Sequence, residues 1–135
     1  MSQIPPLAQE LKTKLENRSA TIAIVGLGYV GLPLARAMHS AGFKVIGFDL
    51  DDEKIKLLTA GETYLHHLGK DLVADLAASD RFTPTNDYAS LSKADAVILC
   101  VPTPLGKHND PDMSYIVEST KMVAKTLHRG QLISL

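Results

Sequence analysis

The chain has 135 residues, a formal net charge of −1, 45% hydrophobic residues and one cysteine. This length corresponds to about one domain with a buried core, and the near-neutral charge does not suggest nucleic acid or an anionic membrane as the main partner. A single cysteine excludes an intrachain disulfide and favours a reducing compartment. No apolar stretch approaches the roughly 20 residues that cross a bilayer, so we expect a cytoplasmic protein without a membrane segment.

Residues 1–19 are predicted to form a helical extension. Leu7, Leu11 and Leu15 recur at every fourth position after the pair Pro5-Pro6, which suits the start of a helix. We expect this leucine stripe to dock on the same domain or on a second subunit.

The remaining residues, 20–135, form one domain in which strand and helix signals alternate. Strands are predicted at 21–25, 44–48, 82–85, 95–101 and 131–135, and helices at 30–40, 52–59, 71–78 and 113–127, with a helical turn at 88–92. Strands that alternate with helices form a parallel sheet with right-handed crossovers. The predicted fold is therefore α/β, a Rossmann-type doubly wound parallel sheet.

The last predicted strand coincides with the end of the chain. Parallel strands are normally followed by a loop, and a doubly wound dinucleotide-binding fold usually continues to a sixth strand. This chain stops on Leu132-Ile133-Ser134-Leu135. We therefore expect the N-terminal piece of a longer protein, with its sheet truncated at about the fifth strand.

A glycine-rich turn, Gly26-Leu27-Gly28-Tyr29-Val30-Gly31, follows the first predicted strand. In this pattern Gly26 permits the tight turn, Gly28 lets the backbone approach a pyrophosphate, and Gly31 lets the helix pack close to the sheet. The helix that begins near Tyr29 directs its free N–H groups and the positive end of its dipole at the phosphates. The turn therefore predicts a dinucleotide site.

Asp49 ends the second predicted strand, at about the spacing expected for the acid that holds the adenine ribose. Its carboxylate would accept hydrogen bonds from both ribose hydroxyls and, with Asp51 and Asp52, would repel a 2′-phosphate. NAD is therefore favoured over NADP. Lys54 either contacts the ribose or adenine edge, or pairs on a solvated helix face.

The second wall of the cofactor site is expected at Val101-Pro102-Thr103-Pro104, after the fourth strand. The two prolines hold this exit extended, because each fixes its own φ and restrains the residue before it. The Thr103 hydroxyl between them can hydrogen-bond a ribose or a phosphate. The alternative is a stiff loop without a ligand.

Several separated motifs resemble one family. GLGYVGLPLA (26–35), VIGFDLD (45–51) and CVPTPLGKHNDPDMSYI (100–116) are similar to the UDP-glucose/GDP-mannose dehydrogenase family. The N-terminal helix and TYLHH (63–67) favour its UDP-N-acetylglucosamine or UDP-N-acetylmannosamine 6-dehydrogenase branch.

The resemblance implies roles for five residues. Tyr29 and Val30 would contact NAD through the start of the helix, Asp49 and Lys54 would hold the adenosine ribose, and Thr103 would touch the cofactor from the opposite side. It also implies oxidation of the C6 alcohol of a UDP-sugar, with UDP-N-acetylglucosamine favoured, to the uronic acid with two NAD in a homo-oligomer. The family's catalytic cysteine, lysine and glutamate follow the point where this chain ends. No catalytic residue is assigned here, and we expect NAD binding without turnover.

Two other functions share some of these features. A β-hydroxyacid dehydrogenase has the same glycine pattern, although the motif after the fourth strand fits the sugar-nucleotide family better. A stand-alone regulatory module that senses a dinucleotide fits the size of the chain.

Five further residues are interpreted without a catalytic role. Cys100 lies on an apolar strand and is predicted to be a small core residue. The pair His66-His67 lacks a ligand spacing, so no metal site is predicted. His39 and His128 lie near helix C-termini, where a partly positive imidazole is favourable.

Overall fold

The computed structural model describes residues 3–65 and 70–135. Its elements are α1 (Pro6–Glu16), β1 (Thr21–Val25), α2 (Gly31–Ser40), β2 (Lys44–Phe48), α3 (Asp52–Ala60), α4 (Lys70–Ala77), β3 (Phe82–Thr85), the 3₁₀ helix η2 (Tyr88–Lys93), β4 (Ala96–Leu99), α5 (Ser114–Lys125) and β5 (Leu132–Ser134). Each strand and helix predicted within residues 20–135 is present, and the predicted ends differ from these by one or two residues at most.

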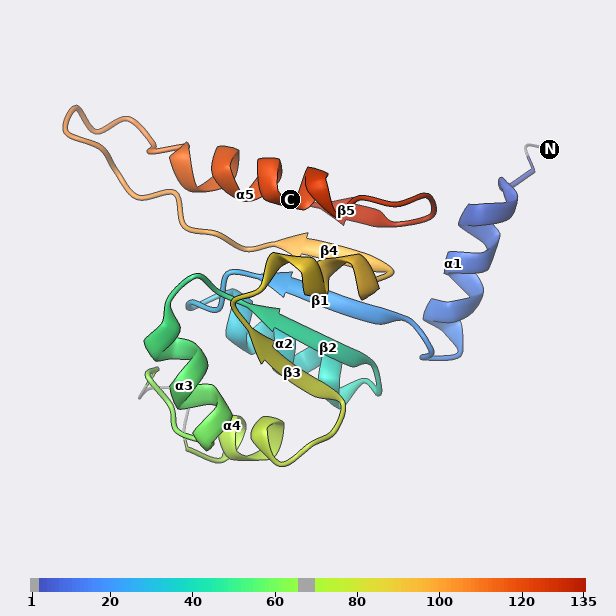
Figure 1. Cartoon of the computed structure of the whole chain (residues 1–135), viewed down its shortest axis with the longest axis horizontal. Helices are drawn as coiled ribbons and strands as arrows, with labels where there is room; N and C mark the ends of the chain where they lie inside the picture. Colours follow the sequence, from blue (N-terminus) through green and yellow to red (C-terminus); the bar gives the residue numbers. More distant parts are fainter. Residues whose placement is uncertain (1–2, 66–69) are drawn as a thin grey trace.

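The strands form a five-stranded parallel sheet in the order β3-β2-β1-β4-β5 (Figure 1). From β1 the chain winds outward through β2 to β3, and then returns to β4 on the other side of β1 and continues to β5. The winding direction therefore reverses between β1 and β4, which confirms the predicted doubly wound topology. At such a switch point the carboxyl ends of the strands leave a crevice for a ligand.

Helices cover both faces of the sheet and give it two apolar layers. Side chains from β1 and β2 pack with α2, α3 and α4 on one face, including Ile24, Leu32, Leu58 and Val73. On the other face they pack with η2 and α5, including Val25, Phe48, Leu91, Val97 and Val123. Because β1 is buried on both faces, it reads as a continuous apolar run rather than an alternating one.

The two edges of the sheet differ in chemistry. Pro84 lies in the edge strand β3, opposite Gly47 of β2, and proline is confined to edge strands because it has no N–H for a strand ladder. The other edge strand, β5, has three exposed residues, among them Leu132 and Ile133.

Helix α1 lies beside the amino-terminal ends of the strands (Figure 1). Its residues are all at least partly exposed, but Leu15 packs against the core. Just beyond its end, the Arg18 guanidinium lies 5.1 Å from the centre of the Phe43 ring. The leucine stripe thus contacts its own domain at its carboxyl end, while Leu7 remains exposed at the other end.

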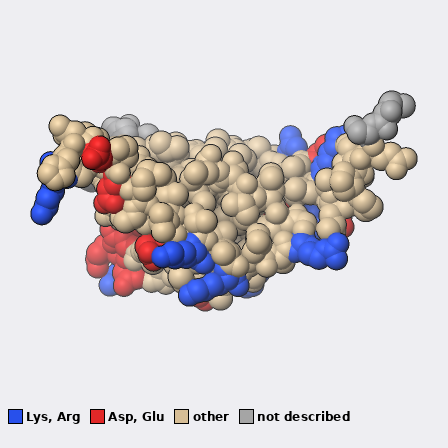
Figure 2. Space-filling model, turned by 90° about the horizontal axis from the view of Figure 1, so that it is seen from above, with Lys and Arg blue, Asp and Glu red and all other residues tan. Residues whose placement is uncertain are grey.

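The surface is unevenly charged. The face seen from above in Figure 2 has few charged side chains in its middle, and acids and bases gather toward its ends and along one edge. Among the described residues, no helix is long and apolar enough to cross a membrane.

Candidate cofactor-binding site

The glycine turn between β1 and α2 is shaped by two glycines that the fold itself requires. Gly26 has a φ of +97°, and a Cβ on it would lie 2.7 Å from the carbonyl oxygen of Cys100. A Cβ on Gly31 would lie 1.6 Å from the carbonyl oxygen of Gly26. These close approaches confirm the tight turn and the close packing of the helix that the pattern predicts.

Gly28 differs from both neighbours. A Cβ built on it would have no atom of the described residues within 4 Å, and its φ lies outside the left-handed region that the turn imposes on Gly26. The packing of the described residues therefore does not require a glycine here. Because Gly28 has no side chain, a ligand can approach its backbone from outside.

The Asp49 carboxylate, at the end of β2, accepts a hydrogen bond from this turn. Its Oδ2 accepts a hydrogen bond from the Leu27 N–H at 2.9 Å, and its Oδ1 accepts one from the Asp51 N–H at 2.9 Å. Only 15% of the side chain is exposed. A carboxylate has about four acceptor sites, so each oxygen keeps capacity for a further donor.

Lys54 points toward Asp49 from α3. Its Nζ lies 3.7 Å from Asp49 Oδ2 and 5.4 Å from the centre of the Tyr64 ring. Asp51 begins this helix by accepting a hydrogen bond from the Glu53 N–H at 3.0 Å. Of the two roles that the sequence leaves open for Lys54, this geometry favours the one at the site.

A cleft of about 680 Å³ opens beyond the glycine turn. It brings together seven of the ten residues predicted to bind the cofactor, with three more side chains that close its walls. The lining residues are Gly28, Tyr29, Val30, Lys54, Tyr64, Leu65, Cys100, Val101, Pro102 and Thr103. At its floor α2 begins, and Val30 at the N-cap has no polar side-chain atom to cap the helix. The Leu32 N–H donates to the carbonyl oxygen of Gly28 at 3.1 Å and Pro33 has no N–H, so an anion here would meet the backbone before Leu32 and the positive end of the helix dipole.

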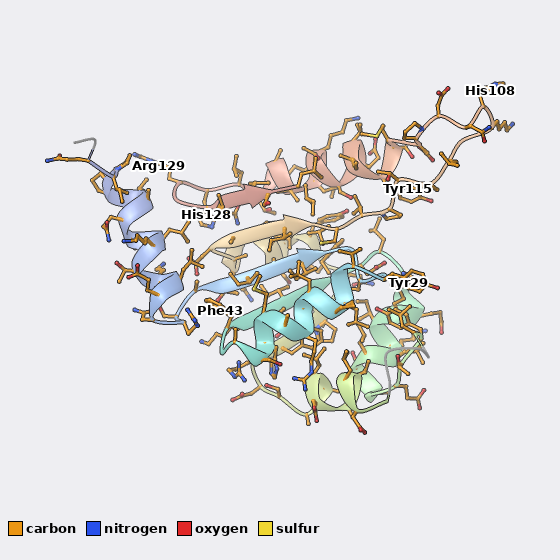
Figure 3. The ribbon with its side chains drawn as sticks, turned by 180° about the vertical axis from the view of Figure 1, so that it is seen from behind. Tyr29, Phe43, His108, Tyr115, His128 and Arg129 are labelled. Atoms are coloured by element: carbon orange, nitrogen blue, oxygen red, sulfur yellow. The ribbon has the colours of Figure 1, made fainter. Side chains whose placement is uncertain are left out.

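A smaller hollow of about 100 Å³ begins at Gly26 and Asp49. It is mostly apolar and aromatic, and its other lining residues are Val25, Phe48, Leu50, Tyr88, Val101, Tyr115 and Ser119. The rings of Phe48 and Tyr88 lie 4.0 Å apart, centre to centre. Figure 3 places Tyr115 at the same end of the sheet as Tyr29, whereas Phe43 and His128 lie at the opposite end. Val101 borders both spaces and so connects the hollow to the cleft.

Tyr64 lies in the site but was not predicted there, because the sequence indicates it only as part of the motif TYLHH (63–67). Its hydroxyl donates a hydrogen bond to the carbonyl oxygen of Leu27, within the glycine turn. Burial, with the nearby charges of Asp49 and Asp51, raises the pKa of Tyr64. The only sequence signal was an aromatic residue shortly after the glycine that ends α3.

Two interpretations of single residues are corrected. Cys100 is not fully buried, because it forms part of the cleft wall, and desolvation raises the pKa of its thiol. His39 is buried with Nε2 2.7 Å from Ser79 Oγ, and desolvation, then the charges of two arginines, lowers its pKa. A neutral rather than a partly positive imidazole is favoured there.

The predicted absence of a metal site concerned the pair His66-His67, which lies outside the described residues. Within residues 3–65 and 70–135, no group of three or more His, Cys, Asp or Glu side chains is arranged to hold a metal ion.

Comparisons with known proteins agree with this geometry. Residues 20–135 match the NAD binding domain of the UDP-glucose/GDP-mannose dehydrogenase family. The UDP-N-acetyl-D-mannosamine dehydrogenase of Campylobacter jejuni is 32% identical over 120 residues, which are 88% of this chain and 29% of that protein. In a solved structure, the UDP-D-ManNAc dehydrogenase of Pyrococcus horikoshii matches with a TM-score of 0.73 and 34% identity, over 84% of this chain and 27% of that one.

GDP-mannose dehydrogenase from Pseudomonas aeruginosa has a similar fold, with a TM-score of 0.75 and 30% identity over 80% of this chain and 25% of that one. The chain thus spans less than a third of the length of each of these relatives. The family match favours a nucleotide-sugar dehydrogenase over the β-hydroxyacid dehydrogenase alternative. The chain belongs to the UDP-glucose/GDP-mannose dehydrogenase family, and the part matched is the family's NAD-binding domain.

Proposed function

We propose that the cleft and the hollow hold NAD for a nucleotide-sugar 6-dehydrogenase. The observation that carries this proposal is an open glycine backbone beside a fixed carboxylate. Gly28 faces space that no described residue fills, and Asp49 is held next to it by the Leu27 N–H. A pyrophosphate and a ribose diol are the two groups that need these features side by side.

The adenosine half of NAD is assigned to the smaller hollow. Leu50 and Tyr115 offer apolar surface to a flat base, and the adjacent Asp49 carboxylate accepts from the ribose hydroxyls. Lys54 supports that carboxylate and offers donors toward the same ribose. A 2′-phosphate would meet the charges of Asp49 and Asp51, so this arrangement supports NAD rather than NADP.

The pyrophosphate is assigned to the start of α2, where Gly28, Tyr29 and Val30 form the floor of the cleft. The nicotinamide half then extends along Val101, Pro102 and Thr103, with the threonine hydroxyl as a hydrogen-bonding group for the second ribose. When bound, NAD accepts hydride from the C6 carbon of the sugar. The chain's own residues bind and orient the cofactor for that transfer.

The activity of the whole protein is also part of this proposal. Relatives are named for UDP-N-acetyl-D-mannosamine, whereas the sequence motifs alone favoured UDP-N-acetylglucosamine. We therefore assign a UDP-2-acetamido sugar as the substrate class. Cys100 is the single thiol of the chain, and its raised pKa disfavours the thiolate that a covalent step needs. We accordingly assign Cys100 no covalent role and, as the family resemblance implies, place no catalytic residue among residues 1–135.

We propose that the chain has two parts. Residues 1–19 form the helical extension and residues 20–135 the NAD-binding domain. Membership of the UDP-glucose/GDP-mannose dehydrogenase family supports a homo-oligomer, as the sequence resemblance implies. The single cysteine supports a cytoplasmic location.

Calorimetric titration of the chain with NAD and with NADP tests the cofactor assignment. We expect NAD to bind at least about tenfold more tightly, because a charge repulsion of roughly 1.4 kcal/mol or more at the ribose opposes NADP. Equal affinity for the two cofactors would contradict the role of Asp49, and no binding of NAD would contradict the proposed site. Formation of NADH by the full-length protein from a UDP-2-acetamido sugar tests the assigned activity. NAD binding without any part in such turnover would instead favour the regulatory module.

A further inference from the structure

We propose that Tyr64 is a positioning residue for the cofactor site. Its hydroxyl fixes the peptide unit that joins Leu27 to Gly28, and its ring holds the Lys54 ammonium beside Asp49. This inference rests on the proposed binding of NAD in the same cleft. Tyr64 acts through these neighbours.

The backbone on both sides of Tyr64 is anchored. Gly61 ends α3 with a φ of +79°, which turns the chain back toward the sheet. Thr63 Oγ1 accepts a hydrogen bond from the Leu65 N–H at 3.0 Å, and the Leu65 side chain is buried in the core. Tyr64 is therefore presented to the cleft from a constrained segment.

The Tyr64 hydroxyl controls the orientation of one peptide plane. It donates to the carbonyl oxygen of Leu27, and this carbonyl and the Gly28 N–H belong to the same planar, trans peptide unit, in which they point in opposite directions. Glycine allows such a unit to rotate more freely than other residues do. Holding the Leu27 carbonyl therefore also sets the direction of the Gly28 N–H at the open face of the turn.

The Tyr64 ring acts on the other half of the site. Lys54 Nζ lies 5.4 Å from the centre of the Tyr64 ring, a distance at which a cation is attracted to an aromatic face. The same Nζ lies 3.7 Å from Asp49 Oδ2. Asp49 in turn accepts from the Leu27 N–H. The contacts thus form a closed ring through Asp49, Leu27, Tyr64 and Lys54, which joins the turn assigned to the pyrophosphate with the carboxylate assigned to the ribose.

The two parts of this role are separated by Tyr64→Phe and Tyr64→Leu. Tyr64→Phe removes only the hydroxyl, and we expect NAD to bind roughly three- to tenfold more weakly, as for the loss of one neutral hydrogen bond. The Gly28 amide resonance should shift or broaden in ¹H–¹⁵N spectra. Tyr64→Leu also removes the ring, which frees Lys54 to meet a 2′-phosphate. The preference for NAD over NADP should then fall by about two- to fivefold in Tyr64→Leu, but not in Tyr64→Phe.

Thr59→Val is the matched control. It removes a hydroxyl that donates to the Ile55 carbonyl oxygen at 2.8 Å on the exposed surface of α3, and it should leave the NAD affinity unchanged. Thermal melting identifies variants that fail to fold, and if Tyr64→Leu is one, Tyr64→Phe decides. Unchanged NAD affinity in Tyr64→Phe, or weaker binding with an unchanged Gly28 resonance, would overturn the inference. Absence of NAD binding by the unsubstituted chain would instead refute the proposed function.

Discussion

Two aspartates at opposite ends of the sheet use the same contacts for different purposes. Asp49, at the carboxyl ends of the strands, accepts from the Leu27 N–H, with Lys54 Nζ 3.7 Å away. Asp95, at the amino ends, accepts from the Thr21 N–H at 2.8 Å, with Lys14 Nζ at 3.1 Å.

The lysine makes the difference between these ends. Lys14 comes from α1 and hydrogen-bonds Asp95 directly, and this bond, with the attraction between the two charges, raises the pKa of Lys14. Lys54 is farther from its aspartate and faces the cleft. The same pair of residue types thus attaches a helix at one end of the sheet. At the other end it leaves acceptor capacity for a ligand.

The largest effect is expected from a side chain at Gly28. Gly28→Val should weaken NAD binding on the order of a hundredfold, because the added atoms occupy the space assigned to the pyrophosphate. The melting temperature should change little, since no described residue lies in that space. Calorimetry and thermal melting measure the two quantities.

Gly31→Ala is the matched control for the turn. Its Cβ would clash with the Gly26 carbonyl oxygen, so we expect a clear loss of thermal stability. A Gly28→Val protein that binds NAD normally would contradict the assignment of the pyrophosphate.

The next largest effect separates the two aspartates. Asp49→Ala should weaken NAD binding roughly 10- to 100-fold, because hydrogen bonds to a charged acceptor are lost. Calorimetric titration with NAD measures this change. Similar affinities for NAD in Asp49→Ala and in the unsubstituted chain would contradict a binding role for Asp49 and so its functional difference from Asp95.

Asp95→Ala provides the reciprocal control. We expect it to lower the free energy of unfolding by about 1–3 kcal/mol, because the Thr21 N–H loses its acceptor and Lys14 of α1 loses its ion pair with the sheet. Its NAD affinity should stay within about twofold, since Asp95 lies at the end of the sheet opposite to the cleft. Urea titration and calorimetry on the same preparations measure both quantities.

The smallest effect concerns pH and His39. Desolvation, with the charges of Arg81 and Arg36, lowers the pKa of His39 in the fold, so the unfolded chain binds more protons below its own pKa of about 6.5. The free energy of unfolding should therefore decrease as the pH falls from about 6.5 toward the folded pKa. His39→Gln should flatten this slope in urea titrations. A stability that rises over the same acid range would contradict a neutral His39.

The fold and the glycine turn were predictable because their signals are local. Gly26 and Gly31 have their reasons within one turn and one helix, and Asp49 follows from its place after β2. The smaller hollow was not predictable, since Tyr88 and Tyr115 line one space only after α5 packs on the sheet. The role of Tyr64 was missed and the charge of His39 was wrongly predicted for the same reason: their partners, Leu27 and Ser79, are far away in sequence.

Pro84 in the edge strand β3 has a consequence for assembly. A strand approaching β3 from outside would meet a position without an N–H donor, whereas β5 presents an ordinary backbone with apolar side chains. Pairing of a further strand is therefore disfavoured on the β3 side of the sheet, whereas the backbone of β5 can accept one.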